Sequence, residues 1–156
     1  MEAIAALLAA SDLATFLRHG RWSYAAVNAG HIFGIALLVG SIMVFDLRLL
    51  GLWRAVPLAH LARPLVPVAA SGLLLAVLTG LVLFSVRAPE YVVMPVFAAK
   101  LALIAAGTLS AIGHHRLHGR ILERAGPPML RLAGATSLLC WTGALLLGRS
   151  LAFAGD

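Results

Sequence analysis

Four long apolar runs constrain the fold of this chain more than any other feature. They cover residues 24–47, 65–86, 92–113 and 130–151. Each has about 20 residues, which as a helix is enough to cross the roughly 30 Å hydrocarbon layer of a membrane. Lipid offers no hydrogen-bonding partner to a peptide group, so each run must be helical. The sequence therefore predicts an all-α membrane protein with a four-helix transmembrane bundle over residues 24–156.

The composition agrees with this prediction and argues against a nucleic-acid-binding function. Hydrophobic residues make up 62% of the 156 residues and charged residues only 12%, whereas a soluble domain carries roughly 25% charged residues. The net charge is +6, but the arginines stand singly at the ends of the apolar runs. A nucleic-acid binder gathers its cations into a stripe or patch. We therefore expect a lipid bilayer, and no nucleic acid, as the main partner.

Residues 1–23 form a separate N-terminal segment of different character. Leu7 and Phe16 belong to an apolar set that recurs at helical spacing, and Asp12 and Arg18 lie among them. A short helix with one apolar and one polar face typically lies in the membrane interface. The sequence predicts one interfacial amphipathic helix over Glu2–Arg18, ahead of the bundle.

Composition and the positions of arginine predict the membrane and the orientation of the helices in it. Sparse lysine with abundant alanine, leucine, glycine and arginine is typical of a GC-rich bacterial genome. Orientation follows from the loops, because cytoplasmic loops of membrane proteins are enriched in arginine and lysine. We therefore expect a multi-pass protein of a bacterial inner membrane, with the first and third connections in the cytoplasm and both termini in the periplasm. The cations near these two connections are Arg48, Arg54, Arg63, Arg116, Arg120, Arg124 and Arg131, against the acids Asp46 and Glu123.

Polar residues at membrane depth define one candidate site in the outer half of the bundle. His31 in the first run and Lys100 in the third lie about 10–12 Å below the outer surface, at about 1.5 Å per helical residue. Thr79 reaches nearly the same depth, and Asn28 shares the face of His31. An ionisable group in the hydrocarbon layer is costly, so such positions are functional candidates.

The pattern around His31 predicts a cofactor site, with haem b or a quinone as the cofactor. His31 would be an axial haem ligand, and Lys100 would pair with a propionate or a quinone oxygen. In the alternative interpretation, His31 forms a hydrogen bond between helices and Lys100 extends towards the membrane surface.

A second cluster of histidines lies near the cytoplasmic connections. His114 and His118 are one helical turn apart, a spacing that can chelate a transition metal, and His60 is a candidate third ligand. His60 with His115 or His118 could instead hold a haem iron. The other interpretation is a basic interfacial loop that contacts anionic lipid. His31 and His115 are roughly 20 Å or more apart along the membrane normal, so they cannot share one iron.

The remaining features predict packing rather than chemistry. Glycines such as Gly34, Gly72 and Gly134 predict close approach between helices. Asp46 and Arg48 predict an ion pair at the inner end of the first helix, with Arg63 as a further partner. The sequence has no motif of a hydrolase or of a phosphate-binding loop, so we do not assign an enzyme activity.

Six short motifs lie along the chain at or near the apolar runs. They are His31-Ile-Phe-Gly34 with its apolar continuation, Asp46-Leu-Arg-Leu-Leu-Gly51, Leu78-Thr-Gly-Leu81, Phe97-Ala-Ala-Lys100, His115-Arg116 and Arg131-Leu-Ala-Gly134. These motifs resemble those of an uncharacterised family of small bacterial four-helix integral membrane proteins. The resemblance implies the same fold and makes His31, Asp46, Lys100 and His115 signature positions, but it implies no reaction. The Phe97–Lys100 element and His31 also resemble CopD-like copper-resistance domains and small b-type cytochromes.

Three functions remain open at this point. The favoured one is a cofactor-binding redox subunit that passes electrons to other membrane subunits, because an intramembrane lysine level with a histidine is costly to keep. The second is a membrane protein that handles copper or another transition metal. The third is a structural or assembly subunit without chemistry of its own, acting within a larger complex or a homo-oligomer.

Overall fold

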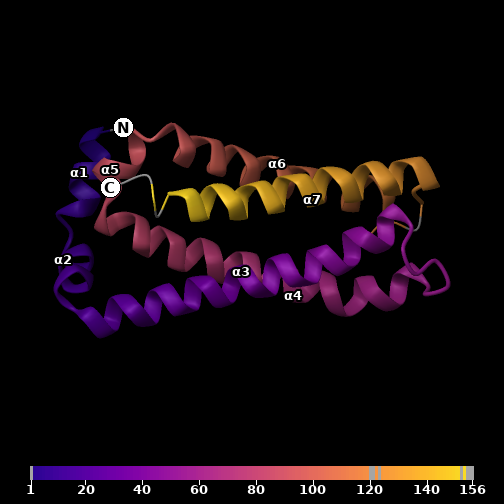
Figure 1. Ribbon diagram of the computed structural model, residues 1–156, viewed down its shortest axis with the longest axis horizontal. Coiled ribbons are helices and arrows are strands. Elements are labelled where there is room, and N and C mark those ends of the chain that lie inside the picture. Colours follow the sequence, from indigo (N-terminus) through magenta and orange to yellow (C-terminus); the bar gives the residue numbers. More distant parts are fainter. Residues whose placement is uncertain (1, 120–121, 123, 152, 154–156) are drawn as a thin grey trace.

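The computed structural model describes residues 2–119, 122, 124–151 and 153. Within them every regular element is a helix, and four of the helices are long and apolar enough to cross a membrane. These four run along the long axis of the molecule, as Figure 1 shows. The all-α prediction with four long apolar helices is therefore confirmed. The helices are α1 (Glu2–Ala9), α2 (Asp12–His19), α3 (Arg21–Leu50), α4 (Leu58–Val86), α5 (Ala88–Val92), α6 (Pro95–His118) and α7 (Pro127–Ser150).

The long helices extend beyond the apolar runs that predicted them. Helix α3 ends where Gly51 adopts a left-handed backbone with φ of 115°, and its N–H donates to the carbonyls of Arg48 and Leu47. Glycine takes this conformation without a steric penalty, which is why it commonly ends helices. Helix α6 continues through Gly113 to His118, so the histidines near its end are helical.

Helix α4 begins earlier than the sequence predicts. The predicted apolar run begins at residue 65, next to Pro64 and Pro67, and proline is typical of the first turn of a helix. The helix instead starts at Leu58, and both prolines lie inside it. A proline near a helix end is tolerated because it removes only the hydrogen bond to a carbonyl four residues back. The two carbonyls belong to His60 and Arg63, close to the polar end of the helix, where water is available to them.

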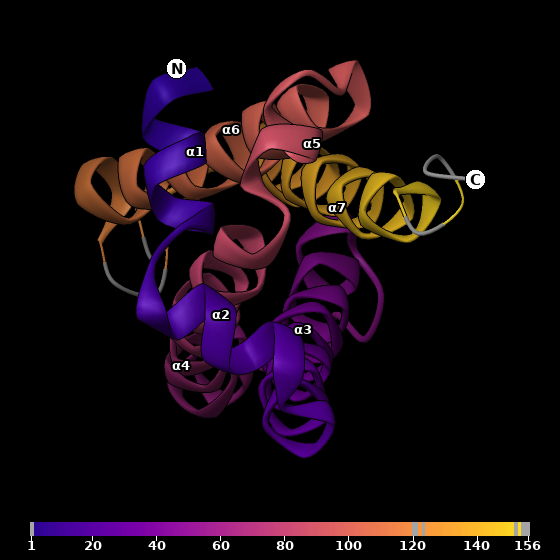
Figure 2. The same ribbon diagram turned by 90° about the vertical axis from the view of Figure 1, so that its left-hand side faces the viewer.

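The N-terminal segment forms two short helices instead of one. Ser11 interrupts the predicted helix: its hydroxyl donates to the carbonyl of Leu8 and accepts from the N–H of Ala14, which caps α2. Serine is a strongly preferred capping residue for this reason. Figure 2 shows α1 and α2 lying across one end of the long helices, where α1 packs against α5 and α2 packs against α4 and α3. Arg18 fixes them there, donating to the carbonyls of Ala9 at 3.2 Å and Val86 at 3.1 Å.

The four long helices are joined along three seams. Helix α3 packs against both α4 and α7, and α7 packs against α6. Across the described residues α4 and α6 have no close backbone approach, although the rings of Phe84 on α4 and Phe97 on α6 stack with centroids 5.3 Å apart near α5. Figure 2 shows the two helices on the same side of the molecule but apart. The bundle is therefore two helical hairpins joined mainly by the α3–α7 seam, and α4 and α6 are separated away from this aromatic contact.

Glycine allows the closest of these approaches. A Cβ atom on Gly72 would lie 2.6 Å from the amide nitrogen of Leu38, and one on Gly34 would lie 2.7 Å from that of Ala76. On the α3–α7 seam, a Cβ on Gly134 would lie 2.9 Å from the carbonyl oxygen of Asp46. The predicted close approach at Gly34, Gly72 and Gly134 is confirmed.

Candidate functional site

A cavity of about 610 Å³ lies among the four long helices, near the end that carries the two connections. Its volume falls within the roughly 300–1,000 Å³ that is usual for small-molecule sites. The lining is mainly leucine, isoleucine, valine and alanine, with Phe45 among them. The polar and charged lining residues are Ser41, Asp46, Thr108, Ser110, His114, His115, Arg116, Ser137 and Trp141.

Asp46 is the most deeply buried ionisable residue of this lining. It comes from α3, its exposed fraction is 2%, and its Oδ2 atom has no hydrogen-bond partner among the described residues. The hydroxyl of Ser137 on α7 is the polar group that faces the carboxyl. An unpartnered buried carboxylate is costly, and Asp46 is placed where a molecule in the cavity could meet it.

The predicted ion pair between Asp46 and Arg48 is wrong. Arg48 turns to the following connection, where Nε donates to the carbonyl of Val56 at 2.9 Å and Nη2 to that of Arg54 at 3.3 Å. Neither Arg48 nor Arg63 forms a salt bridge with Asp46 in the described part of the chain. The two side chains are two residues apart on a helix and so point in different directions.

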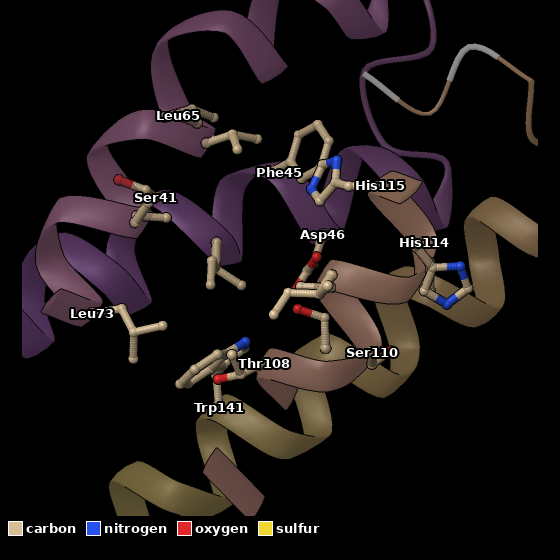
Figure 3. Close-up of a pocket in the computed structure, with 18 of the residues that line it drawn as sticks. Ser41, Phe45, Asp46, Leu65, Leu73, Thr108, Ser110, His114, His115 and Trp141 are labelled. Atoms are coloured by element: carbon tan, nitrogen blue, oxygen red, sulfur yellow. The ribbon is translucent and has the colours of Figure 1, made fainter. Parts of the chain in front are cut away.

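Trp141 contributes a second unpartnered polar atom to the same cavity. Its side chain is 5% exposed, and its indole Nε1 has no partner within the part of the chain that the structure describes. The ring lies against α6 at Gly107, where a Cβ atom would be 3.1 Å from Cε2. Figure 3 shows Asp46 and Trp141 approaching the cavity from two different helices. Sequence reasoning missed Trp141, although a buried indole N–H normally needs a partner.

The two unpartnered atoms are chemically complementary. A carboxylate oxygen accepts hydrogen bonds and an indole N–H donates them. Leaving one such group buried without a partner costs about 1–3 kcal/mol, and specific exceptions in a folded protein call for an explanation. A bound molecule with an apolar body, one donor and one acceptor would satisfy both atoms.

His31 lies on the α3–α4 seam and joins the two helices. Its Nδ1 atom is 2.9 Å from the carbonyl oxygen of Ala76 and 3.1 Å from Oγ1 of Thr79. A carbonyl can only accept, so Nδ1 carries a proton and donates it. Gly80 makes room, because a Cβ there would be 3.0 Å from Cε1 of the ring. The interhelical hydrogen bond expected in the alternative interpretation of His31 is confirmed.

Lys100 belongs to a different seam. Its Cε and Nζ atoms pack over Gly148 of α7, where a Cβ would be 3.3 Å from each. The Lys100 side chain is half-buried, and Asn28 is exposed. The structure therefore joins His31 to Thr79 on the α3–α4 seam, packs Lys100 on the α6–α7 seam, and leaves Asn28 on the surface.

The inner histidines do not assemble as one group. The rings of His114 and His118 are 5.8 Å apart between centroids, whereas His60 is exposed in the first turn of α4. Over the described ranges, no three His, Cys, Asp or Glu side chains come together to hold a metal ion. His115 lines the cavity beside Phe45, and Figure 3 shows His114 turned away from Asp46.

The fold and the site define a class: an all-α protein of four long apolar helices that surround a mainly apolar cavity with two complementary, unpartnered polar atoms. Comparisons with family models, curated proteins and solved structures found nothing that matches the chain. The resemblance to uncharacterised four-helix and CopD-like membrane proteins stays a prediction.

Proposed function

We propose that this chain is a multi-pass membrane protein that binds a small amphipathic molecule with a quinol-type head group. One observation carries the proposal: Asp46 and Trp141 line the same cavity, and each has a buried polar atom, Oδ2 and Nε1, without a partner among the described residues. Ligand pockets are typically apolar with a few polar groups that fix orientation, and this lining has that character.

The surface of the long helices supports a membrane location. Large apolar side chains cover their outward faces, for example Leu74 at 61% exposed and Leu139 at 73%. A soluble monomer does not expose contiguous apolar surface of this extent. The arginines near the connections support a bacterial inner membrane with these connections in the cytoplasm. Under that orientation the cavity lies in the inner half of the bilayer.

A quinol head group suits the polar atoms of the cavity. One hydroxyl of the quinol donates to a carboxylate, and the oxygen of the other hydroxyl accepts from an indole N–H. The flat ring would lie among apolar side chains and Phe45, as aromatic rings prefer. Haem b has less support, because the histidines of the cavity lining, His114 and His115, both lie on α6. His60 is exposed and does not line the cavity.

The proposal is tested with the detergent-purified protein and decyl-substituted benzoquinol, using quenching of tryptophan fluorescence to measure binding. We expect saturable binding that weakens about ten-fold in Asp46→Asn, since a hydrogen bond to a charged group contributes about 1.5–3 kcal/mol. Trp141→Phe should weaken binding by a similar or smaller factor. An absorption spectrum of the same sample reports any haem.

Matched controls come from the other end of the molecule. Asp12→Asn and Trp22→Phe change an acid and an indole of the same kinds, both exposed, and should leave the dissociation constant unchanged. Absence of saturable binding by the unmodified protein would contradict the proposal. An equal loss in cavity and control variants would contradict the assigned site.

A further inference from the structure

We infer that the ligand enters the cavity sideways, from the hydrocarbon layer of the membrane, through the gap between α4 and α6. The ligand class is therefore a molecule dissolved in the bilayer, with a tail that stays in the lipid. This inference rests on the proposed function, because it assigns the route by which the cavity between Asp46 and Trp141 is filled.

In the described ranges the gap is the side of the bundle without a close backbone approach between helices. Helix α3 packs against α4 and α7, and α7 packs against α6. Helices α4 and α6 touch through the stacked rings of Phe84 and Phe97, at the end near α5 and outside the cavity lining. The α3–α4 seam is closed at backbone distance by Gly34 and Gly72. On the α6–α7 seam a Cβ on Gly107 would be 3.1 Å from the Trp141 ring. A molecule of ligand size has no comparable passage through these seams.

The exposure of the lining residues locates the mouth of the cavity at this gap. Ala70 on α4, with Ile112 and Arg116 on α6, are exposed and also line the cavity. The lining residues of α3 and α7 are buried or half-buried, and they include Asp46 and Trp141. Helices α3 and α7 thus form the floor of the cavity, and α4 and α6 form its rim.

Both routes along the bundle axis are filled with apolar side chains. Towards the end with α1 and α2, Leu38, Ala69 and Trp141 form a buried cluster. Towards the connections, Phe45 and Leu49 belong to a second cluster that also includes Ala62, Leu122 and Ala133. Close-packed apolar clusters leave no continuous path for a polar solute.

The rim lies at the depth of the hydrocarbon layer. Ala70 is 12 residues into α4 and Ile112 is six residues from the end of α6, or about 18 Å and 9 Å along the helices. The neighbouring outward residues are apolar: Leu74 is 61% exposed and Leu109 is 68% exposed. Arg116 lies near the end of α6, where a charged side chain reaches the headgroups. A mouth with this surround faces acyl chains rather than water.

The test closes the gap reversibly. Ala70→Cys and Ile112→Cys are introduced together into a Cys140→Ala background and bridged with a flexible bifunctional thiosulfonate, which a reductant removes. The protein is reconstituted in phosphatidylcholine vesicles, and decyl-substituted benzoquinol is the ligand. We expect binding and release to slow at least ten-fold in the bridged protein. The original rates should return after reduction, with the final occupancy unchanged throughout.

The outcomes separate the two proposals. Exchange that is equally fast with the bridge in place overturns the lateral route and leaves the proposed function standing. A lack of binding by the unbridged protein overturns both. A bridge that joins two copies of the chain, seen as a dimer on a denaturing gel, shows that a second copy covers the gap and overturns the lateral route.

A second pair of variants guards against a bridge that distorts the fold. Ala70→Trp places a large ring at the rim, and Leu74→Trp places the same ring one turn further along α4, outside the cavity lining. We expect slower ligand exchange in the first variant and unchanged exchange in the second. Equal rates in both variants overturn the lateral route.

Discussion

The few polar side chains within the long helices differ in whether they have a partner. The Nδ1 atom of His31 forms hydrogen bonds with the carbonyl of Ala76 and the hydroxyl of Thr79, so this atom has its partners inside the protein. Asp46 and Trp141 each retain a buried polar atom without a partner among the described residues. A satisfied group is explained by packing, whereas a buried unsatisfied group calls for a separate explanation, and the proposed ligand supplies one.

The His31–Thr79 contact should contribute a measurable coupling to stability. We compare His31→Leu, Thr79→Val and the double variant in a double-mutant cycle, with unfolding in mixed detergent as the measurement. Interhelical hydrogen bonds in membrane proteins average about 0.6 kcal/mol in such cycles, and we expect a coupling of about that size. Purely additive effects would contradict the contact. Quinol binding should be unchanged in all three variants.

Replacement of Asp46 should separate stability from function. In Asp46→Leu a buried carboxyl with one unpartnered oxygen gives way to an apolar side chain beside a cavity that has room for it. We expect the free energy of unfolding to rise by about 1–3 kcal/mol, while quinol binding is lost. Thermal unfolding and fluorescence quenching on the same preparation measure the two effects. A lower stability would show that the carboxyl has a favourable internal partner.

At this scale the sequence identified candidates but not their partners. It located His31 and Lys100 as costly polar residues, because an ionisable group in an apolar run stands out, and it assigned Asp46 to an ion pair that the structure does not form. It could not show that Asp46 faces a cavity, since that depends on how α3 and α7 cross at Gly134. Trp141 escaped notice because an aromatic residue in an apolar run resembles ordinary core.

At the scale of helices, the apolar runs predicted the number and approximate place of the long elements. Their ends were less predictable, because helices continue into polar residues as long as water can satisfy the terminal groups. The break at Ser11 and the short helix α5 are local events of a few residues. Hydrophobic periodicity is assessed over several helical turns, so it does not predict a break of a few residues. Such breaks depend on individual capping residues such as Ser11.

Glycine at the α3–α4 crossing should be required for stability. In Gly72→Ala the new Cβ would lie 2.6 Å from the backbone nitrogen of Leu38, so the helices would have to move apart. We expect a loss of about 1–3 kcal/mol, the usual cost of overpacking. The matched control is Gly40→Ala on α3, where a Cβ meets nothing within 4 Å. A control that destabilises as much as Gly72→Ala, by thermal unfolding, would contradict this account.

At the scale of the whole molecule, two hairpins meet mainly along the α3–α7 seam. Helix α3 packs against α4 and α6 against α7, as antiparallel neighbours with short connections usually do. The sequence did not show that the backbones of α4 and α6 would stay apart around the cavity, because apolar periodicity does not specify which non-neighbouring helices pack together. The open side, and with it the accessible cavity, is therefore a tertiary property.

The orientation of the whole molecule can be tested with single cysteines in a Cys140→Ala background. Leu52→Cys lies in the α3–α4 connection, and Val93→Cys lies between α5 and α6 at the opposite end; both positions are exposed. In intact bacterial cells whose outer membrane has been made permeable, we expect a membrane-impermeant maleimide to label Val93→Cys. Leu52→Cys should react only after the inner membrane is opened, because arginine-rich connections are retained in the cytoplasm. The reverse labelling pattern would place the cavity in the outer half of the bilayer, and a quinol would then have to reach Asp46 from the periplasmic leaflet.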